Sequence, residues 1–411
     1  MSSSAGSRGY GAVLRLRGLR AVYFAHAVSM AGTVAAEVAL SILIYQRSGS
    51  PLLSALVLVA SFLPYGLGGT VLSSVADRFA ARRVLVTCDV TSAACIAAML
   101  IPGVPVLGLL GLLLVTGLVA PLFQGSRASS LAHLLPGDLF PVGRSLLRSI
   151  SQTTVLLGFA AGSVTVAAVG PKWLLGADAA SFLASALLIR FGTAYTPATA
   201  PGGATSPRAV VQESLVGLRY IFGHPALRPM LLLSWAVPGF GSFAEGLAVA
   251  YTAEVGSRAT SAGALFTGYA AGTVFAEVVI ARLSPARKRR LLVPLAILSQ
   301  LPLLGFAAAP SIPVAAALLV VSGAGFAFNQ GLDPLILTAT EPAYRGRLFT
   351  VQSSGLMTVQ GLGIGLAGLL GTVAPARFVI CGAGLVGGIV VVILAYRALP
   401  HPFRVTPVPA T

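Results

Sequence analysis

The sequence is poor in charged residues, and in acidic ones above all. Only 9% of its 411 residues are charged, and 11 Asp and Glu stand against 27 Lys and Arg, a formal net charge of +16. The three cysteines, Cys88, Cys95 and Cys381, are odd in number and contain no CxxC pair, which argues against a disulfide framework or a metal site. No P-loop is present, so ATP is not the expected energy source. We therefore expect no cofactor, no metal and no enzyme activity.

Apolar residues are what the sequence has in excess. They make up 56% of the chain, with 47 glycines, a composition outside the range of soluble globular proteins. A bilayer core about 30 Å thick accepts about 20 apolar residues per helix. Twelve apolar runs of suitable length fall at 20–45, 52–76, 84–101, 105–124, 145–169, 173–191, 229–252, 261–282, 291–309, 313–333, 348–372 and 376–396. The fold class predicted is an all-α membrane protein with twelve transmembrane helices in two six-helix pseudo-repeats.

The basic residues predict the topology. With both termini on the cytoplasmic side, only Arg47, Lys172, Arg258 and Arg377 fall on outer segments, and the other 23 of the 27 Lys and Arg fall on inner ones. The positive-inside rule favours this arrangement. Basic groups spread over many inner segments suit anionic lipid headgroups rather than nucleic acid. We predict a multi-pass monomer in a bacterial inner membrane, the bacterial origin being inferred from the heavy use of Arg, Ala and Gly.

A change in composition separates the two groups of six runs. Residues 193–210 are rich in Pro, Gly, Thr and Ala, and the apolar positions of 211–228 recur every three or four residues, as in a helix lying along the membrane surface. The predicted organisation is a cytoplasmic segment 1–19, a six-helix bundle 20–191, a cytoplasmic linker with an amphipathic helix 192–228, a second six-helix bundle 229–396 and a cytoplasmic tail 397–411.

The two halves repeat each other with a shift of about 207 residues. An acid follows an arginine by seventeen positions in both halves, Glu37 after Arg20 and Glu245 after Arg228. Further matches in the same register pair Gly49-Ser50 with Gly256-Ser257, Ser54-Ala55 with Ser261-Ala262, and Arg82-Arg83 with Arg289-Arg290. Duplicated bundles joined by a polar linker are the arrangement expected of transporters that move two halves about a central site.

The stretch GLGGTVLSSVADRFAARRVLV at 66–86 resembles the loop motif between the second and third helices of the major facilitator superfamily, with Ser73 and Ala80 in place of two motif glycines. The resemblance covers nearly the whole chain. YQRSGSPLLSALVL, LLGADAASFLASALL, ESLVGLRYIFGHPALRPMLL and YRGRLFTVQ are most similar to its drug and siderophore exporter branch, which contains macrolide efflux proteins. That branch usually has a Gly-Pro in the fifth helix, where this chain has Gly158-Phe159.

The charged loop of this motif has two interpretations. Asp77 with Arg78, Arg82 and Arg83 is expected to form a conformational latch, which stabilises one of the alternating states by pairing across the bundle interface. The arginines alone would also serve as positive-inside anchors. We favour the latch because an aspartate adds nothing to an anchor.

Polar residues within the spans indicate where cargo and protons bind, because each is costly in lipid unless it faces a cavity or a partner. His26, Ser29, Thr33, Glu37 and Ser41 follow steps of three and four residues and so form one stripe, and removal from water favours the neutral form of a carboxyl group such as that of Glu37. The predicted proton-coupling residues are Glu37, Glu245, Asp333 and Glu277. The predicted substrate-binding residues are His26, Thr33, Gln152, Trp235, Phe240, Asn329, Gln330 and Gln360.

Structural roles remain open for each of these residues. Glu37 and Glu245 would also serve as hydrogen-bond partners of neighbouring helices, the amides would tie helices together, and His26 is favoured as a packing residue. Asp178 is expected to cap the helix that begins near 173, and Asp89 has no evident partner. The sequence predicts a proton-coupled exporter of a small amphipathic or hydrophobic molecule, a drug, secondary metabolite or siderophore. The alternatives are a nutrient uptake permease and a non-transporting membrane sensor or scaffold.

Overall fold

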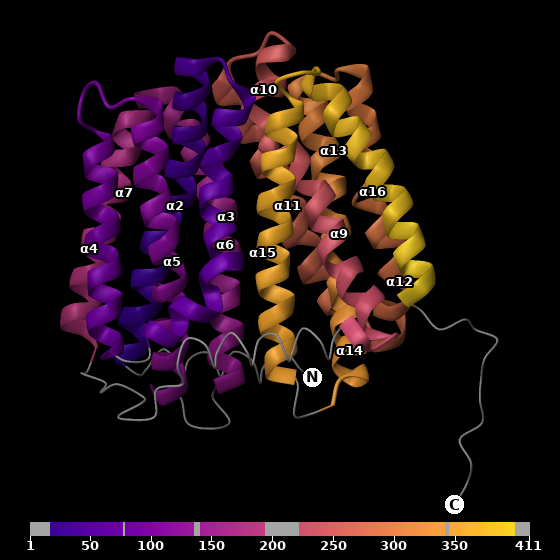
Figure 1. Cartoon of the computed structure of the whole chain (residues 1–411), viewed down its shortest axis with the longest axis horizontal. Helices are drawn as coiled ribbons and strands as arrows, with labels where there is room; N and C mark the ends of the chain where they lie inside the picture. Colours follow the sequence, from indigo (N-terminus) through magenta and orange to yellow (C-terminus); the bar gives the residue numbers. More distant parts are fainter. Residues whose placement is uncertain (1–16, 77–78, 135–139, 194–221, 342–344, 399–411) are drawn as a thin grey trace, which may run out of the picture.

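The computed structural model describes residues 17–76, 79–134, 140–193, 222–341 and 345–398, and all regular secondary structure within them is helical (Figure 1). The helices of the first half are α2 (Arg17–Ser48), α3 (Pro51–Ala76), α4 (Ala81–Met99), α5 (Val106–Leu134), α6 (Phe140–Val169) and α7 (Pro171–Gly192). Those of the second half are α9 (Leu227–Gly246), α10 (Ala248–Glu254), η2 (Ala259–Ser261), α11 (Ala262–Ala281), α12 (Pro285–Leu298), η3 (Leu301–Ala308), α13 (Ile312–Gly325), η4 (Phe326–Phe328), α14 (Asn329–Ala339), α15 (Arg345–Leu370) and α16 (Ala376–Ala398). Most of the predicted amphipathic helix at 211–228 lies outside the described residues.

Eight helical segments of the described chain are long and apolar enough to cross a bilayer, and α9 with α10, which meet at a 45° bend, make a ninth. The other three predicted runs are the helices α3, α4 and α6. Arg82, Arg83 and Asp89 lie within the 19 residues of α4 and lower its hydropathy, while α3 and α6 contribute shorter apolar stretches, Pro51–Pro64 and Thr153–Val169. The all-helical membrane fold is confirmed, and a count of twelve crossings stays a prediction.

The packing of helices repeats between the two halves. In the first half α2 packs against α6 and α7, and in the second half its counterpart α9 packs against α15 and α16. In the same way, α3 packs against α5, and its counterpart α11 packs against α13. Gly49 and Gly256, which the repeat places in register, both have positive φ angles, 65° and 68°. Each follows the first span of its half, where the left-handed conformation favours a residue without a Cβ. The predicted pseudo-repeat is therefore present in the structure as well as in the sequence.

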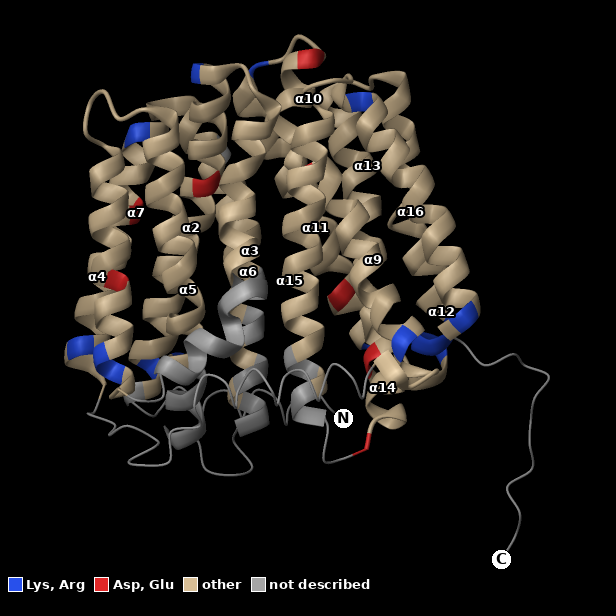
Figure 2. Ribbon diagram, in the orientation of Figure 1, with Lys and Arg blue, Asp and Glu red and all other residues tan. Residues whose placement is uncertain are grey.

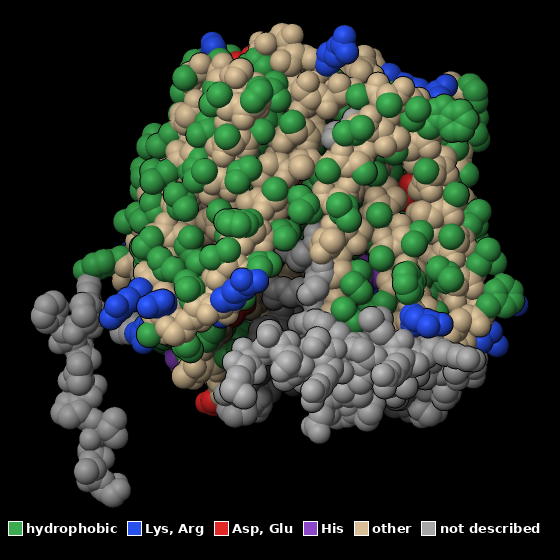
Figure 3. Space-filling view, turned by 180° about the vertical axis from the view of Figure 1, so that it is seen from behind, with side chains coloured by type: hydrophobic (Ala, Val, Ile, Leu, Met, Phe, Trp, Pro, Cys, Tyr) green, Lys and Arg blue, Asp and Glu red, His purple; other side chains and the backbone are tan. Residues whose placement is uncertain are grey.

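Charged residues gather at the two ends of the helices (Figure 2). We call the end that carries Arg20, Arg82, Arg83, Arg282 and the basic run 287–290 the arginine-rich face. The opposite end, the arginine-poor face, carries Arg47, Lys172, Arg258 and Arg377, and there Arg377 Nε pairs with Glu254 Oε1 at 3.2 Å. Between the two faces the outward side chains are largely apolar (Figure 3). Phe191, Phe275 and Leu107 are among the exposed hydrophobic residues, as expected of helices that face lipid.

The two bundles share one apolar core near the arginine-poor face. Val38 of α2 and Leu58 of α3 belong to the same buried cluster as Phe243 of α9, Leu247 and Phe266 of α11. Each of these side chains is at least nine-tenths buried. The bundles are therefore packed together on this side.

Two helix pairs related by the repeat join the bundles, and we call them together the interbundle seam. α3 packs against α15, and α11, the counterpart of α3, packs against α6. A Cβ placed on Gly368 of α15 would lie 2.6 Å from the Cβ of Ala55 in α3, so the glycine allows close approach. In the other pair, the rings of Phe159 in α6 and Phe266 in α11 stack with centroids 5.2 Å apart.

Candidate functional site

A cavity of about 460 Å³ is lined by helices of both bundles, on the arginine-rich side of the shared core. Most of its wall comes from α2 to α7, and the second bundle contributes residues of α9, α11, η4 and α15. Aliphatic and aromatic side chains such as Leu40, Phe62, Phe123 and Phe182 form much of the surface. Pockets of about 300 to 1,000 Å³ with apolar walls are typical of sites for drug-sized molecules.

Glu37 lines this cavity from α2. Ser61 Oγ of α3 donates a hydrogen bond to Glu37 Oε1 at 2.5 Å. Among the residues that the structure describes, no basic side chain pairs with Glu37. His26, Ser29 and Thr33 line the same cavity, whereas Ser41, the last member of the predicted stripe, is buried. The stripe therefore faces the cavity over most of its length.

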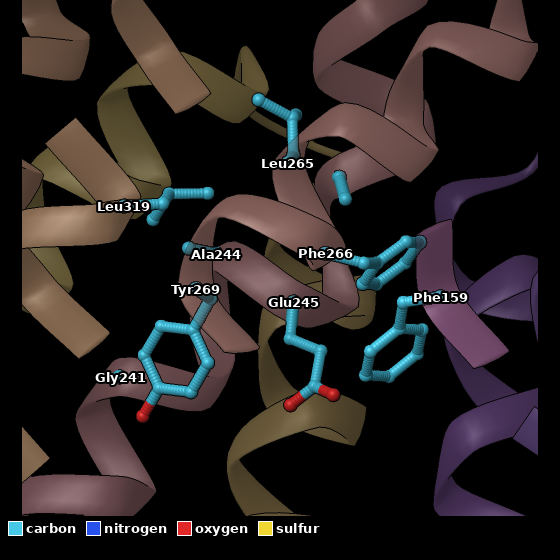
Figure 4. Close-up of a pocket in the computed structure, with 9 residues that line it drawn as sticks. Phe159, Gly241, Ala244, Glu245, Leu265, Phe266, Tyr269 and Leu319 are labelled. Atoms are coloured by element: carbon cyan, nitrogen blue, oxygen red, sulfur yellow. The ribbon is translucent and has the colours of Figure 1, made fainter. Parts of the chain in front are cut away.

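Glu245 lines the cavity from α9, so the structure brings the two repeat-related glutamates to one site. The two carboxyl groups are near enough to interact electrostatically. A smaller pocket of about 20 Å³ adjoins the cavity and shares Phe159, Glu245 and Tyr269 with it. In Figure 4 the carboxyl group of Glu245 and the hydroxyl group of Tyr269 point to the same side. Tyr269, which sequence reasoning missed, thus places a hydroxyl group near this acid.

Two acids outside the predicted site, Asp89 and Asp178, also line the cavity. Asp89 of α4 accepts a hydrogen bond from Ser185 Oγ of α7 at 2.6 Å. Asp178 is completely buried. The expectation that Asp178 caps its helix is wrong, because α7 begins at Pro171 and Asp178 therefore lies two turns inside it. Within the described part of the chain, no cluster of three or more His, Cys, Asp or Glu side chains could hold a metal ion.

A buried arginine lies toward the other end of the cavity. Arg127 of α5 is 7% exposed and contacts His26 Nδ1 through its guanidinium group, and the other ring nitrogen of His26 lies 2.8 Å from Ser151 Oγ. Because a guanidinium only donates, Nδ1 must accept and His26 is held as the neutral tautomer with a proton on Nε2. Sequence reasoning missed Arg127 because the apolar run ends at 124, whereas the helix continues to Leu134.

Of the remaining predicted acids and amides that the structure describes, Gln360 lines this cavity, and Asp333, Glu277, Asn329 and Gln330 do not. Gln352 Nε2 of α15 donates to Asp333 Oδ1 at 3.0 Å. Gln330 accepts from Lys288 Nζ at 3.3 Å and donates to the Glu277 carbonyl oxygen at 3.3 Å. These contacts join α11, α12, α14 and α15 within the second bundle. Asn329, which begins α14, is not in the lining.

The predicted aromatic residues of α9 pack against neighbouring helices. Trp235 Nε1 donates to the Gln352 carbonyl oxygen at 3.0 Å, and its indole lies against Gly355. Phe240 lies against Gly387 of α16, and its ring stacks on Phe243 of the same helix with centroids 6.3 Å apart. Neither Trp235 nor Phe240 reaches the cavity. The side chain of Gln152 lies outside the described residues.

The predicted latch is only partly within the described chain. Asp77 and Arg78 lie outside the described residues. Arg82 Nη1 donates to the carbonyl oxygen of Thr193 at 3.2 Å, which ties the start of α4 to the end of α7 in the same bundle. Arg83 is exposed.

Known proteins similar to this chain include a family model and relatives that match it over most of their length. The model of the Major Facilitator Superfamily matches residues 22–253 and 246–411. The multidrug efflux pump Tap of Mycolicibacterium fortuitum is 24% identical over 369 residues, which cover 86% of this chain and 89% of that pump. Tap of Mycobacterium tuberculosis H37Rv is 26% identical over 365 residues, covering 85% of this chain and 86% of the pump.

Solved structures show the same fold at low sequence identity. A POT family transporter in complex with 5-aminolevulinic acid superposes with a TM-score of 0.72 and 12% identity, covering 93% of this chain and 96% of that one. Another POT family structure, in complex with a thioalcohol-conjugated peptide, gives a TM-score of 0.69 and 13% identity, with 92% and 96% covered. At these identities the likeness concerns the fold alone.

Proposed function

Since the chain belongs to the major facilitator superfamily, we propose that it is a secondary active transporter that exports a small amphipathic molecule in exchange for protons. The family match confirms the resemblance of its loop motif and establishes a multi-pass membrane transporter. What we propose beyond the family is that transport is outward, that protons are the coupling ion and that the cargo is a small amphipathic molecule. Relatives that are multidrug efflux pumps support export, and the cargo would be a drug, a secondary metabolite or a siderophore.

The observation that carries the proposal is the meeting of Glu37 and Glu245 at one cavity. They come from repeat-related helices of opposite bundles, and the cavity walls include both of them. A carboxyl group that faces a water-accessible cavity within a membrane protein is the usual carrier of a transported proton. Glu37, held by Ser61, is the primary coupling residue, and Glu245 lies opposite it. Asp333 and Glu277 become the next candidates if neither glutamate proves to be the coupling residue.

The lining favours a cargo with an apolar body and a positive charge. Among the described residues, four carboxyl groups reach the cavity, from Glu37, Asp89, Asp178 and Glu245, against one guanidinium group, that of Arg127. His26 adds no charge in the state described, because Arg127 holds its Nδ1 as an acceptor. A cation would compete with protons for the carboxylates, which is the exchange that antiport requires.

The distribution of charge and the packing of the bundles support one orientation of the protein in the membrane. The positive-inside rule would place the arginine-rich face, where α2 begins and α16 ends, in the cytoplasm. The bundles are packed together near the arginine-poor face, and the cavity lies on the other side of that packing. A cargo would therefore reach the site from the cytoplasmic side in this state, and separation of the seam would release it outside. The latch of Asp77, Arg78, Arg82 and Arg83 remains part of the proposal as a device that stabilises one of the two states.

The test uses a bacterial strain that lacks its own efflux pumps and the lipophilic cation ethidium as probe. Cells that express the protein are expected to accumulate less ethidium than control cells, and Glu37→Gln is expected to remove the difference because the amide cannot titrate. Glu254→Gln is the matched control, since Glu254 lies at the arginine-poor face away from the cavity. Export by Glu37→Gln cells with the wild-type dependence on the proton gradient would show that Glu37 is not the coupling site.

The same strain distinguishes the alternatives. A nutrient permease would raise the uptake of its cargo and leave ethidium accumulation unchanged. A sensor or scaffold would give no gradient-dependent movement of any member of a broad panel of compounds in vesicles that contain the purified protein.

A further inference from the structure

Asp178 is a buried acid whose surroundings do not explain it as a structural residue. Its side chain is completely excluded from solvent, yet it borders the large cavity. Its Oδ2 atom is buried and has no hydrogen-bond partner among the described residues. Its position two turns inside α7 also excludes a helix-capping role. A buried carboxyl oxygen without a partner is costly unless the group is neutral or used.

The face of α7 around Asp178 is polar in a helical pattern. Asp178, Ser181 and Ser185 are spaced by three and four residues, so they lie on one side of the helix. Ser181 Oγ is 2.8 Å from the carbonyl oxygen of Asp178 and 3.3 Å from its Oδ1. One turn further on, Ser185 donates to Asp89 of α4 at 2.6 Å. This face of α7 therefore places one serine hydroxyl group beside each of two cavity acids.

α2 approaches Asp178 closely through a glycine. A Cβ on Gly32 would lie 2.5 Å from Asp178 Oδ1 and 3.1 Å from the Cβ of Ser181. Glu37 follows Gly32 by five residues, a rise of about 7.5 Å along α2. Glu37 and Asp178 interact electrostatically in this arrangement. The two carboxyl groups thus belong to one cluster formed by helices α2 and α7.

The charged and titratable groups near Asp178 are mostly acidic. α2 supplies Glu37 and, further away, His26, and α4 supplies Asp89 and Cys88. Glu245 of α9 interacts with Glu37 from the other bundle. On α7 itself, Lys172 and Arg190 are exposed near its two ends. Because like charges in a poorly solvated site disfavour each other, ionisation of Glu37 and ionisation of Asp178 must be linked.

We infer that Asp178 and Glu37 form a coupled proton-binding pair, with Asp178 as a second proton-carrying group of the transporter. The inference deepens the proposed function and rests on it for its role in transport. Protonation of either acid removes its negative charge and so makes the proton of the other easier to lose. A cation bound to the Glu37 carboxylate neutralises the same charge, so it likewise favours release of the proton at Asp178. The pair links α2 to α7, the two helices that pack closely on each other in the first bundle.

The first test needs no transported cargo. Infrared difference spectra between acidic and alkaline pH, recorded on the purified protein in lipid, report the carboxyl groups that titrate. Asp178→Asn is expected to remove one carboxyl signal and to move the titration midpoint of the signal that Glu37→Gln removes. A spectrum of Asp178→Asn that is identical to that of the wild type would overturn the inference, whether or not the protein exports ethidium.

The second test separates coupling from a structural role in proteoliposomes with ethidium. Asp178→Asn is expected to keep ethidium exchange at equal pH on both sides and to lose accumulation driven by a pH gradient. Loss of exchange together with accumulation, or wild-type accumulation, counts against the inference. Failure of the proposed function appears differently, as a wild-type protein that moves no ethidium while the infrared signal of Asp178 remains.

A variant that keeps the carboxyl group covers the case in which Asp178→Asn does not fold. Ser181→Ala removes the hydroxyl beside Asp178 Oδ1 without adding volume. Loss of a donor that stabilises a carboxylate is expected to move the midpoint of the infrared titration to higher pH. An unchanged midpoint would mean that Asp178 does not titrate in this range.

Discussion

Replacement of Phe159 by alanine should shift the balance between the two states of the transporter. Phe159 of α6 and Phe266 of α11 belong to opposite bundles, and their rings stack with centroids 5.2 Å apart and an interplanar angle of 15°. An aromatic pair in this range contributes about 0.5 to 1.5 kcal/mol beyond the area that the rings bury. Since 1.4 kcal/mol corresponds to a factor of ten, the ratio of the state with the seam packed to the state with it open should fall by about 2-fold to 12-fold.

Spin labels at Gln46 and Val373 would report this shift, because both are exposed near the arginine-poor face and belong to opposite bundles. Double electron–electron resonance on the protein with its native cysteines replaced should show a larger population at long distance in Phe159→Ala. Leu157→Ala is the control, since Leu157 lies on the same helix with 59% of its surface exposed.

A double-mutant cycle makes the prediction specific to the pair. If the stack is the cause, Phe159→Ala and Phe266→Ala should each shift the distance distribution, and the double variant should shift it by less than the sum. Strictly additive shifts, or a distribution in Phe159→Ala that matches that of Leu157→Ala, would refute the reasoning.

Three further predictions concern other contacts of the described chain. Gly368→Leu should deplete the packed state in the same resonance experiment, because even a Cβ at this position would lie 2.6 Å from the Cβ of Ala55 in α3. A distance distribution equal to that of the wild type would show that the seam is looser than described. Gly49→Ala and Gly256→Ala should each lower the free energy of unfolding by about 1 to 2 kcal/mol, since both have positive φ and no neighbour within 4 Å of an added Cβ; thermal unfolding of the two variants should give equal losses. Arg127→Gln should tighten ethidium binding by about fivefold. Arg127 contacts His26, and a cation at Glu37 would lie eleven residues, about 16.5 Å, further along α2, where a unit charge at an effective dielectric of about 20 contributes about 1 kcal/mol. Fluorescence titration of the purified protein checks this, and unchanged affinity would place the cation outside the field of Arg127.

Much of the fold followed from the sequence because it rests on two strong signals. The lengths of the apolar runs predicted where the helices lie. The repeat predicted which residues of the two halves correspond, including Gly49 and Gly256. The repeat also predicted that Glu37 and Glu245 would be related, and the cavity contains both of them. These inferences need only spacing along the chain.

The rest of the site depends on which way a side chain points, and spacing does not give that. The predicted apolar run ends at 124 and so leaves Arg127 outside it, although the helix continues to Leu134 and the Arg127 side chain is buried. The sixth run starts at 173, two residues after α7 begins, but even from 173 Asp178 lies more than one turn inside the helix, so its spacing did not favour a capping role. Trp235 seemed suited to a cavity, but its indole packs between α9 and α15.

The makeup of the interbundle seam bears on leakage through the transporter. Glycine, alanine and stacked rings meet across it, and their attraction is dispersive, so it acts over a very short range. A gap of about 0.5 to 1 Å already forfeits a quarter to a half of such attraction. A half-open seam is therefore poorly stabilised, and the bundles spend little time between the fully packed and the fully separated arrangement. Under the proposed antiport, such all-or-none opening would leave little time in which protons could cross without cargo moving the other way.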